Sequence, residues 1–232
     1  GTVEGRSVVE PFRKLVLKHH PDTDVEFLEA ECVDLLPEEK KVVCQDTSVI
    51  VGEVSEFELD YDVLIVAVGA ANNTFNTPGV EENCFFLKDI RDAYTIRNVI
   101  MDLVETAYIP GQPLDERQRL LHFVVVGGGP SGVEFAAELH DFLEEDVSKI
   151  YPKIKGDLKI TMVQSQDHIL NTYDKQISDY AEDIFKQDKI NLLVNARCVS
   201  CSNVWYLTHN CTLVFLFFYF LDGLCILCHY LL

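Results

Sequence analysis

Apolar positions along the chain form two kinds of pattern: short apolar runs that are typical of strands, and apolar side chains at helical spacing. The continuous apolar run at residues 60–70 predicts a buried parallel strand. Apolar side chains recur at helical spacing over residues 90–108, which predicts a helix. Later, strand patterns and helix patterns follow one another at residues 121–126, 131–148, 157–164, 174–186 and 191–199. This alternation predicts an α/β fold with a parallel sheet that helices cover on both faces.

The remaining segments carry weaker patterns. Residues 7–18 predict a short helix, and residues 72–80 predict a loop rich in turn-forming side chains. Residues 110–119 combine prolines, a glycine and charged side chains, and they predict a linker or domain junction. Further strands are predicted at residues 24–34, 40–44 and 57–59.

A glycine-rich turn separates the apolar stretch at residues 121–126 from the helical pattern that follows. Gly127, Gly129 and Gly132 have the spacing G-x-G-x-x-G, which suits a turn whose backbone N–H groups and helix N-terminus bind a pyrophosphate. The preceding strand and the following helix supply the context that this motif requires. A glycine-rich turn with a structural role alone is the alternative. The candidate site consists of Gly127, Gly128, Gly129, Pro130, Ser131 and Gly132.

The composition is strongly acidic, with 19 Lys and Arg against 38 Asp and Glu and a net charge of -19. This charge argues against a nucleic-acid partner and against electrostatic attraction to anionic lipid. Three of the eight cysteines are scattered and five lie in the last 35 residues, so they do not form a secreted disulfide framework. The chain opens with neither an initiator Met nor a signal or transit segment, so we expect targeting information to lie outside it.

Four longer segments carry a family resemblance: residues 1–15, 61–80, 121–146 and 167–177. In this order they resemble the type II (alternative, rotenone-insensitive) NAD(P)H:ubiquinone oxidoreductases, above all the external mitochondrial enzymes of plants. The resemblance covers residues 1–197. It implies a flavoprotein with two Rossmann-like domains that passes a hydride from NAD(P)H to FAD and electrons on to ubiquinone without pumping protons. It also implies a peripheral place on the intermembrane-space side of the mitochondrial inner membrane, and it leaves a homodimer open.

Several residues take their expected roles from this resemblance. It implies that Ala67, Val68 and Gly69 lie beside the flavin nucleotide, where small side chains let a ligand approach; a packed strand without FAD is the alternative. Val33 belongs to the strand whose backbone contacts the FAD adenine. Glu134 would lie near the flavin and nicotinamide rings and influence hydride or proton transfer. The alternative for Glu134 is a carboxylate in the first turn of a helix, which the helix dipole favours.

Gln164 ends the predicted strand at residues 157–164, where NADH-preferring members of this family have Glu. A carboxylate there repels the 2′-phosphate of NADPH, whereas a neutral amide can hydrogen-bond to either nucleotide. Gln164 therefore favours NADPH over NADH, or the use of both. Two features oppose this preference. Gly132 and Gln164 are 32 residues apart, which requires an insertion, and the acidic Asp167 rather than an Arg closely follows Gln164.

The end of the chain, residues 201–232, departs from the family pattern. It has no Lys or Arg, and residues 212–232 would be long enough as a helix to cross a membrane. A membrane anchor is one interpretation; the abrupt change favours the other, a splicing or gene-model artefact. Two C-x2-C pairs at residues 198–201 and 225–228 suggest zinc, but an apolar run fills the 23-residue gap between them. We therefore expect no metal site.

The resemblance divides the chain into a partial FAD-binding domain (1–87), an incomplete NAD(P)H-binding domain (88–200) and a hydrophobic tail (201–232). The turn at residues 127–132 then belongs to NAD(P)H. Because the first glycine-rich FAD motif and the later parts of both domains are absent from the chain, we expect it to bind FAD poorly and to be inactive alone. Two other functions stay open: a dithiol-type FAD/NAD(P) reductase, and a non-catalytic nucleotide-binding or membrane-tethered remnant.

Overall fold

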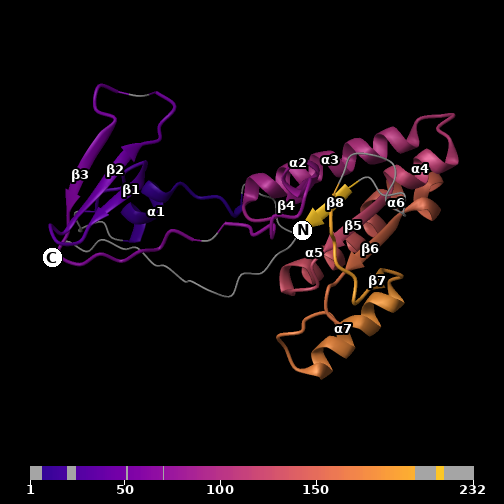
Figure 1. Ribbon diagram of the computed structural model, residues 1–232. Coiled ribbons are helices and arrows are strands. Elements are labelled where there is room, and N and C mark those ends of the chain that lie inside the picture. Colours follow the sequence, from indigo (N-terminus) through magenta and orange to yellow (C-terminus); the bar gives the residue numbers. More distant parts are fainter. Residues whose placement is uncertain (1–6, 20–24, 51, 70, 202–212, 217–232) are drawn as a thin grey trace. The chain divides into compact units, whose positions relative to one another are not determined.

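The computed structural model describes residues 7–19, 25–50, 52–69, 71–201 and 213–216. These residues fold into two compact units, and the chain passes from the first to the second between residues 70 and 71 (Figure 1). We expected this boundary between residues 87 and 88. In the structure β4 (Cys84–Phe86) is a strand of the second unit's sheet, where it pairs with β8 (Leu213–Leu216); the division into an FAD-binding and an NAD(P)H-binding domain stays a prediction.

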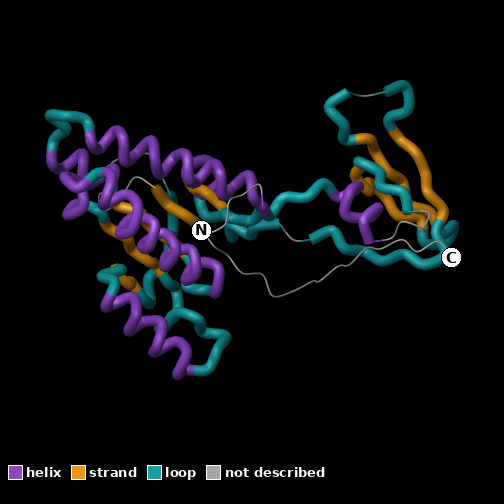
Figure 2. Tube along the Cα trace, turned by 180° about the vertical axis from the view of Figure 1, so that it is seen from behind, coloured by secondary structure: helices purple, strands orange, loops and turns teal. Residues whose placement is uncertain are grey.

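The first unit contains an antiparallel sheet with the strand order β1–β2–β3 and one helix (Figure 2). Val42 and Cys44 of the central strand are buried. A β-bulge interrupts the pairing of β1 with β2 between Cys32 and Asp34. The elements are α1 (Phe12–His19), β1 (Ala30–Leu36), β2 (Lys41–Asp46) and β3 (Glu56–Asp60). The helix and the strands predicted before residue 60 are therefore present, displaced along the chain.

The strand predicted at residues 60–70 is wrong. Asp60 ends β3, Leu64 forms a single bridge, and residues 65–69 have no regular secondary structure. The side chain of Val68 is 70% exposed. A buried parallel strand needs parallel neighbours on its edges and cover on both faces, whereas the described strands of this unit form an antiparallel sheet.

The second unit contains a parallel five-stranded sheet with the order β4–β8–β5–β6–β7. Its remaining strands are β5 (His122–Val126), β6 (Lys159–Val163) and β7 (Asn191–Leu193). Its helices are α2 (Val80–Asn83), α3 (Ile90–Tyr108), α4 (Leu114–Leu120), α5 (Pro130–Asp141), the π-helical segment η2 (Phe142–Val147), α6 (Ser148–Ile150), the 3-10 segment η3 (Pro152–Asp157) and α7 (Lys175–Gln187). The predicted α/β fold with a parallel sheet is confirmed in this unit.

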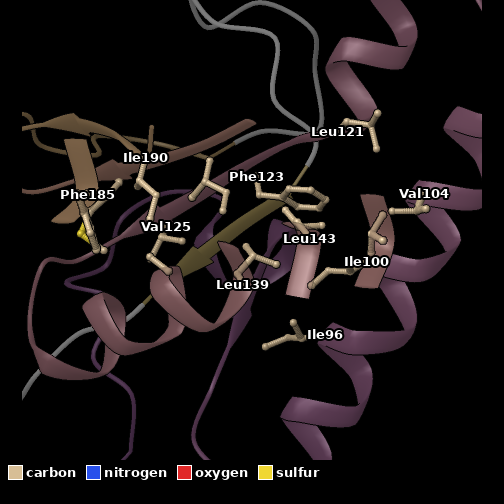
Figure 3. Packing of buried hydrophobic residues seen from close by; sticks show 14 of the residues in the cluster. Ile96, Ile100, Val104, Leu121, Phe123, Val125, Leu139, Leu143, Phe185 and Ile190 are labelled. Carbon is tan, nitrogen blue, oxygen red and sulfur yellow. The ribbon is translucent and has the colours of Figure 1, made fainter. Parts of the chain in front are cut away.

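Both faces of β5 are buried, as its place inside the sheet requires. Phe123 and Val125 point to one face and pack in a cluster with side chains of α3 and α5, as Figure 3 shows. Val124 and Val126 point to the other face and pack with Val80 of α2. Full burial of such a side chain contributes about 1.5–3 kcal/mol, so β5 is the centre of this unit's core.

The two helices before β5 differ in how well the sequence predicts them. α3 has the bounds that the periodicity predicts, and it begins with a capping box in which Asp89 and Asp92 each accept a hydrogen bond from the other's backbone N–H. The linker predicted at residues 110–119 is partly wrong, because α4 occupies most of it. Arg117 of α4 forms a half-buried ion pair with Asp157 (Nε–Oδ2, 2.6 Å), which fastens this helix to the same unit.

β8 lies within residues 201–232, which we expected to be a membrane anchor or a splicing or gene-model artefact. Residues 213–216 instead form a strand that pairs in parallel with β4 and β5. An apolar, β-branched and aromatic sequence suits a strand inside a parallel sheet as well as a lipid-facing helix. Among the described residues, no helix is long and apolar enough to cross a membrane. Residues 217–232, and with them Cys225 and Cys228, lie outside the described residues.

Candidate functional site

The glycine-rich turn links β5 to α5 at the carboxyl edge of the parallel sheet. Gly127 has φ +111°, a conformation that other residues rarely adopt. Its N–H donates to the carbonyl of Val163 at the end of β6 (2.9 Å). Gly129 is extended and is the N-cap of α5, and Pro130 is the first residue of the helix. The strand, turn and helix predicted around this motif are therefore all present.

Gly128 is crowded by its neighbours. A Cβ atom here would lie 2.8 Å from Cγ2 of Ile169 and 3.2 Å from Cδ of Gln164. The carbonyl of Gly128 also accepts a hydrogen bond from the N–H of Leu170 (2.7 Å). The loop after β6 is thus pressed against the turn, and a residue without a side chain is needed between them.

Gln164 is buried and fastens the turn to the loop after β6. Its Oε1 accepts hydrogen bonds from the N–H of Ser165 (3.0 Å) and the N–H of Gly128 (3.4 Å), and its Nε2 donates to the carbonyl of His168 (3.2 Å). A side-chain amide has two N–H donors, so the second can serve a ligand. Gln164 therefore supports the turn as well as facing the site.

A cavity of about 310 Å³ lies at this turn. The carboxyl ends of β5, β6 and β7 meet at this edge of the sheet, which is where ligands bind in open α/β sheets. The volume is at the lower end of the range for small-molecule sites. The walls come from four segments: Phe75 and Thr77 before α2, Gly127, Gly128 and Gly129 of the turn, Gln164 and Ser165 after β6, and Ala196, Arg197 and Cys198 after β7.

Two features make this cavity attractive to an anion. Gly129, the N-cap of α5, is in its wall, and none of the described side chains caps that helix. The N–H groups of the first turn and the positive end of the helix dipole therefore favour a negative group here. Arg197, a basic residue, lines the same cavity.

We did not anticipate Arg197, because the expected phosphate partner was a basic residue soon after Gln164. The available clue was β7, whose parallel pairing with β6 brings the residues that follow it beside the end of β6. The backbone confirms this arrangement, because the N–H of Ala196 donates to the carbonyl of Gln164 (2.9 Å).

Glu134 is exposed and is the fifth residue of α5 counted from Pro130. The expected place in the first turn is therefore wrong, and the helix dipole, whose effect falls off within that turn, does not account for Glu134. The described residues that line the cavity do not include it. Its expected role near the flavin and nicotinamide rings stays a prediction.

The residues expected near FAD lie in the first unit, whereas the cavity is in the second. Val33 lies at the bulge of β1, outside the β1–β2 register, and its side chain is 47% exposed. Ala67 and Val68 are exposed as well. Gly69 has φ +69° and open space where a Cβ would lie. The backbone angle therefore explains this glycine, and an FAD site around these four residues stays a prediction.

Comparison with known proteins places the chain in a family. The model of the pyridine nucleotide-disulphide oxidoreductases matches residues 4–204. The chain belongs to this family. The match contains the glycine-rich turn, Gln164 and Arg197, and it ends before β8.

The similar curated proteins are alternative NAD(P)H-ubiquinone oxidoreductases. The mitochondrial external alternative NAD(P)H-ubiquinone oxidoreductase B3 of Arabidopsis thaliana is 49% identical over 204 residues, which are 88% of this chain and 35% of that protein. The mitochondrial external alternative NADH-ubiquinone oxidoreductase of Yarrowia lipolytica is 43% identical over 202 residues, 86% of this chain and 34% of that protein. These matches confirm the resemblance noted in the sequence, and the chain spans about a third of their length.

Solved structures agree with the fold. The structure of NDH2 from Plasmodium falciparum in complex with NADH has a TM-score of 0.74 and 33% identity, and the alignment covers 82% of this chain and 40% of that one. A ferredoxin reductase from Rhodopseudomonas palustris is 18% identical and has a TM-score of 0.61; the alignment covers 86% of this chain and 42% of that one. At 18% identity, the similarity to the ferredoxin reductase shows only that the two chains share a fold.

Proposed function

We propose that this chain is the nucleotide-binding part of a flavoprotein that oxidises NAD(P)H and reduces ubiquinone. The observation that carries the proposal is the cavity at the turn, which combines a glycine backbone, the N-terminus of α5 and the basic residue Arg197. The pyrophosphate would lie at Gly127–Gly132, where backbone N–H groups and the helix dipole favour it. The similarity to an NADH-bound NDH2 supports this assignment.

The preference that we propose is for NADPH. The neutral amide of Gln164 does not repel a 2′-phosphate, and it can offer its second N–H. Arg197 lines the same cavity, and a guanidinium binds phosphate through paired, charge-assisted hydrogen bonds. The two side chains together provide the phosphate contact that neither would provide alone.

The contacts with FAD that we propose involve Val33 and Ala67–Gly69 of the first unit. The bulge leaves the backbone of Val33 outside the β1–β2 register, so its N–H and C=O are suited to the edge of an adenine. FAD, when bound, supplies the hydride acceptor, and Glu134 is our candidate for influencing that transfer.

We propose that the whole protein works peripherally on the intermembrane-space side of the mitochondrial inner membrane, without pumping protons, and that it forms a homodimer. The names of the relatives, which are mitochondrial, external and ubiquinone-reducing, support this assignment. For residues 1–232 alone we propose weak FAD binding and no turnover, because Val33 and Val68, two of the residues expected near FAD, are exposed to solvent.

Nucleotide titration with the variant Arg197→Ala tests the NADPH assignment. We expect the dissociation constant for NADPH to rise about 10-fold to 100-fold, because a charge-assisted hydrogen bond contributes about 1.5–3 kcal/mol, and that for NADH to rise less than about threefold. Arg91→Ala is the control, since it removes the same charge from the exposed first turn of α3. Equal losses for NADPH and NADH would contradict the role of Arg197.

Purification of residues 1–232 tests the proposal of inactivity. We expect little yellow flavin to copurify and no NADPH-dependent quinone reduction. Stoichiometric flavin absorbance together with quinone reduction would contradict it, while leaving the assignment of the NAD(P)H cavity in place.

A further inference from the structure

Two cysteines lie in sulfur contact beside the cavity. Sγ of Cys198 and Sγ of Cys201 are 3.4 Å apart, and both residues are half-buried thiols. A disulfide has an S–S distance of about 2.05 Å, so each sulfur has to move by less than about 1 Å. Cys198 itself lines the cavity, next to Arg197.

Hydrogen bonds hold the backbone on both sides of this pair. The N–H of Ala196 donates to the carbonyl of Gln164 (2.9 Å), and the N–H of Cys201 donates to the carbonyl of Pro78 (2.8 Å). Nδ2 of Asn83 donates to the carbonyl of Cys201 (3.3 Å). The segment is therefore fastened to two loops, which keeps the two sulfurs together in the reduced state.

The surroundings of the pair are apolar. Cys198 and Cys201 pack against the cluster of Val80, Val124 and Val126 on one face of the sheet. Burial, together with the contact with Cys201, raises the pKa of Cys198 to about 11. This thiol is therefore protonated at neutral pH, and since the thiolate is the nucleophile, we expect oxidation to be slow.

We propose that Cys198 and Cys201 form a reversible disulfide in the wall of the cavity, with a small disulfide such as oxidised glutathione as the oxidant. One thiol loses its proton and attacks a glutathione sulfur, which gives a mixed disulfide and releases one glutathione. The second thiol then attacks the protein sulfur of the mixed disulfide and releases the second glutathione. Two protein thiols become one disulfide, one oxidised glutathione becomes two thiols, and the two protons end on glutathione.

This proposal does not rest on the proposed nucleotide function, and its test needs no nucleotide. The full chain is equilibrated with oxidised glutathione, the remaining thiols are alkylated, and chymotryptic peptides are analysed by mass spectrometry. We expect the peptide that carries both cysteines to lose two hydrogens and to escape alkylation. Dithiothreitol should restore both thiols.

Single substitutions identify the pair. In Cys198→Ser or Cys201→Ser, we expect the remaining cysteine to keep a glutathione, because the resolving thiol is missing. Cys84→Ser is the matched control, since Cys84 is half-buried and packs against the same cluster, and it should leave the disulfide unchanged. Circular dichroism checks the fold of each variant. Alkylation of both cysteines at equilibrium, or a disulfide from either one to another cysteine, overturns the proposal.

Discussion

Residues 64–68 and residues 122–126 carry nearly the same pattern, an apolar and largely β-branched run that leads into glycine, but only the second run forms a strand with neighbours on both sides. β5 lies between β8 and β6, and all five of its residues are buried. In the first unit, residues 65–69 have no regular structure, and Val68 is mostly exposed.

The difference shows that a parallel strand depends on its neighbours as much as on its own sequence. In β5, successive side chains enter two separate apolar clusters, one with Phe123 and Val125 and one with Val124 and Val126. The run at residues 64–68 has the side chains for two such clusters, but the described part of its unit offers antiparallel strands instead. The same local pattern therefore has two structural outcomes.

Of the substitutions that test this comparison, a charged residue placed in each of the two apolar runs should give the largest difference in stability. Val125 is fully buried, so in Val125→Asp a carboxylate is left without a partner in the core. We expect the free energy of unfolding of the second unit to fall by about 3–5 kcal/mol. Val68→Asp should change the free energy of unfolding of the first unit by less than about 0.5 kcal/mol, because Val68 is exposed. Urea unfolding measures both, with hydrogen exchange of the amides at residues 122–126 as the probe for Val125→Asp and of those at residues 41–46 for Val68→Asp; equal losses would mean that the two runs are equally buried.

Glycine substitutions sharpen the comparison at the ends of the two runs. Gly128→Ala places a methyl group against Ile169, so we expect a loss of about 1–3 kcal/mol from overpacking and weaker binding of NADH and NADPH. Gly69→Ala should cost about 1 kcal/mol, from its positive φ alone.

Asparagine separates the two causes, because it tolerates a positive φ but is bulkier than alanine. We expect Gly69→Asn to regain most of the stability that Gly69→Ala loses, and Gly128→Asn to lose more than Gly128→Ala. Thermal unfolding of the four variants checks this order. Rescue by asparagine at both positions would contradict the crowding at Gly128.

Each unit also has a side chain that supports a turn. Gln164→Leu removes the buried acceptor of two backbone N–H groups, and we expect it to cost about 1–2 kcal/mol. Asp46, whose carboxylate accepts from the N–H and Oγ of Ser48, supports a turn in the first unit. Because Asp46 is only partly buried, Asp46→Leu should cost less. Urea unfolding gives both values, and a larger loss at Asp46 would contradict the role of burial.

Periodicity and turn chemistry predicted the parts of the fold that are local. The bounds of α3 and the order of β5, turn and α5 follow from spacing within a few residues, and the structure confirms them. The place of β8 between β4 and β5, and the absence of a strand at residues 65–69 in the described structure, depend on pairing with distant segments. Sequence pattern alone does not contain that information.

The site divides in the same way. The glycine turn and Gln164 were predicted from motif and strand end, and in the structure Gly127–Gly129 of the turn and Gln164 line one cavity. Arg197 and Cys198 reach that cavity through the pairing of β7 with β6, so their place could not be read from their distance along the chain. Glu134 was assigned to the wrong turn of α5 because the motif does not fix the first helical residue.

Ion pairs give the smallest expected difference in stability between the two units. The pair in the second unit loses its effect in acid, and the pair in the first unit loses its effect in alkali. Two hydrogen bonds from Arg119 lower the pKa of Glu116 below its ordinary value of 4.5. The pair therefore stabilises the second unit fully above about that pH, by about 0.2–1 kcal/mol, and the effect is lost as the pH falls through the lower folded pKa. In the first unit, the hydrogen bond to Glu58 raises the pKa of Lys41 above its ordinary value of 10.5. The stabilisation that this pair gives to the first unit is therefore lost as the pH rises through the raised pKa. Melting temperatures of Glu116→Gln and Glu58→Gln against pH check both signs: the first variant should converge with the parent chain in acid and the second in alkali, and the reverse order would contradict both assignments.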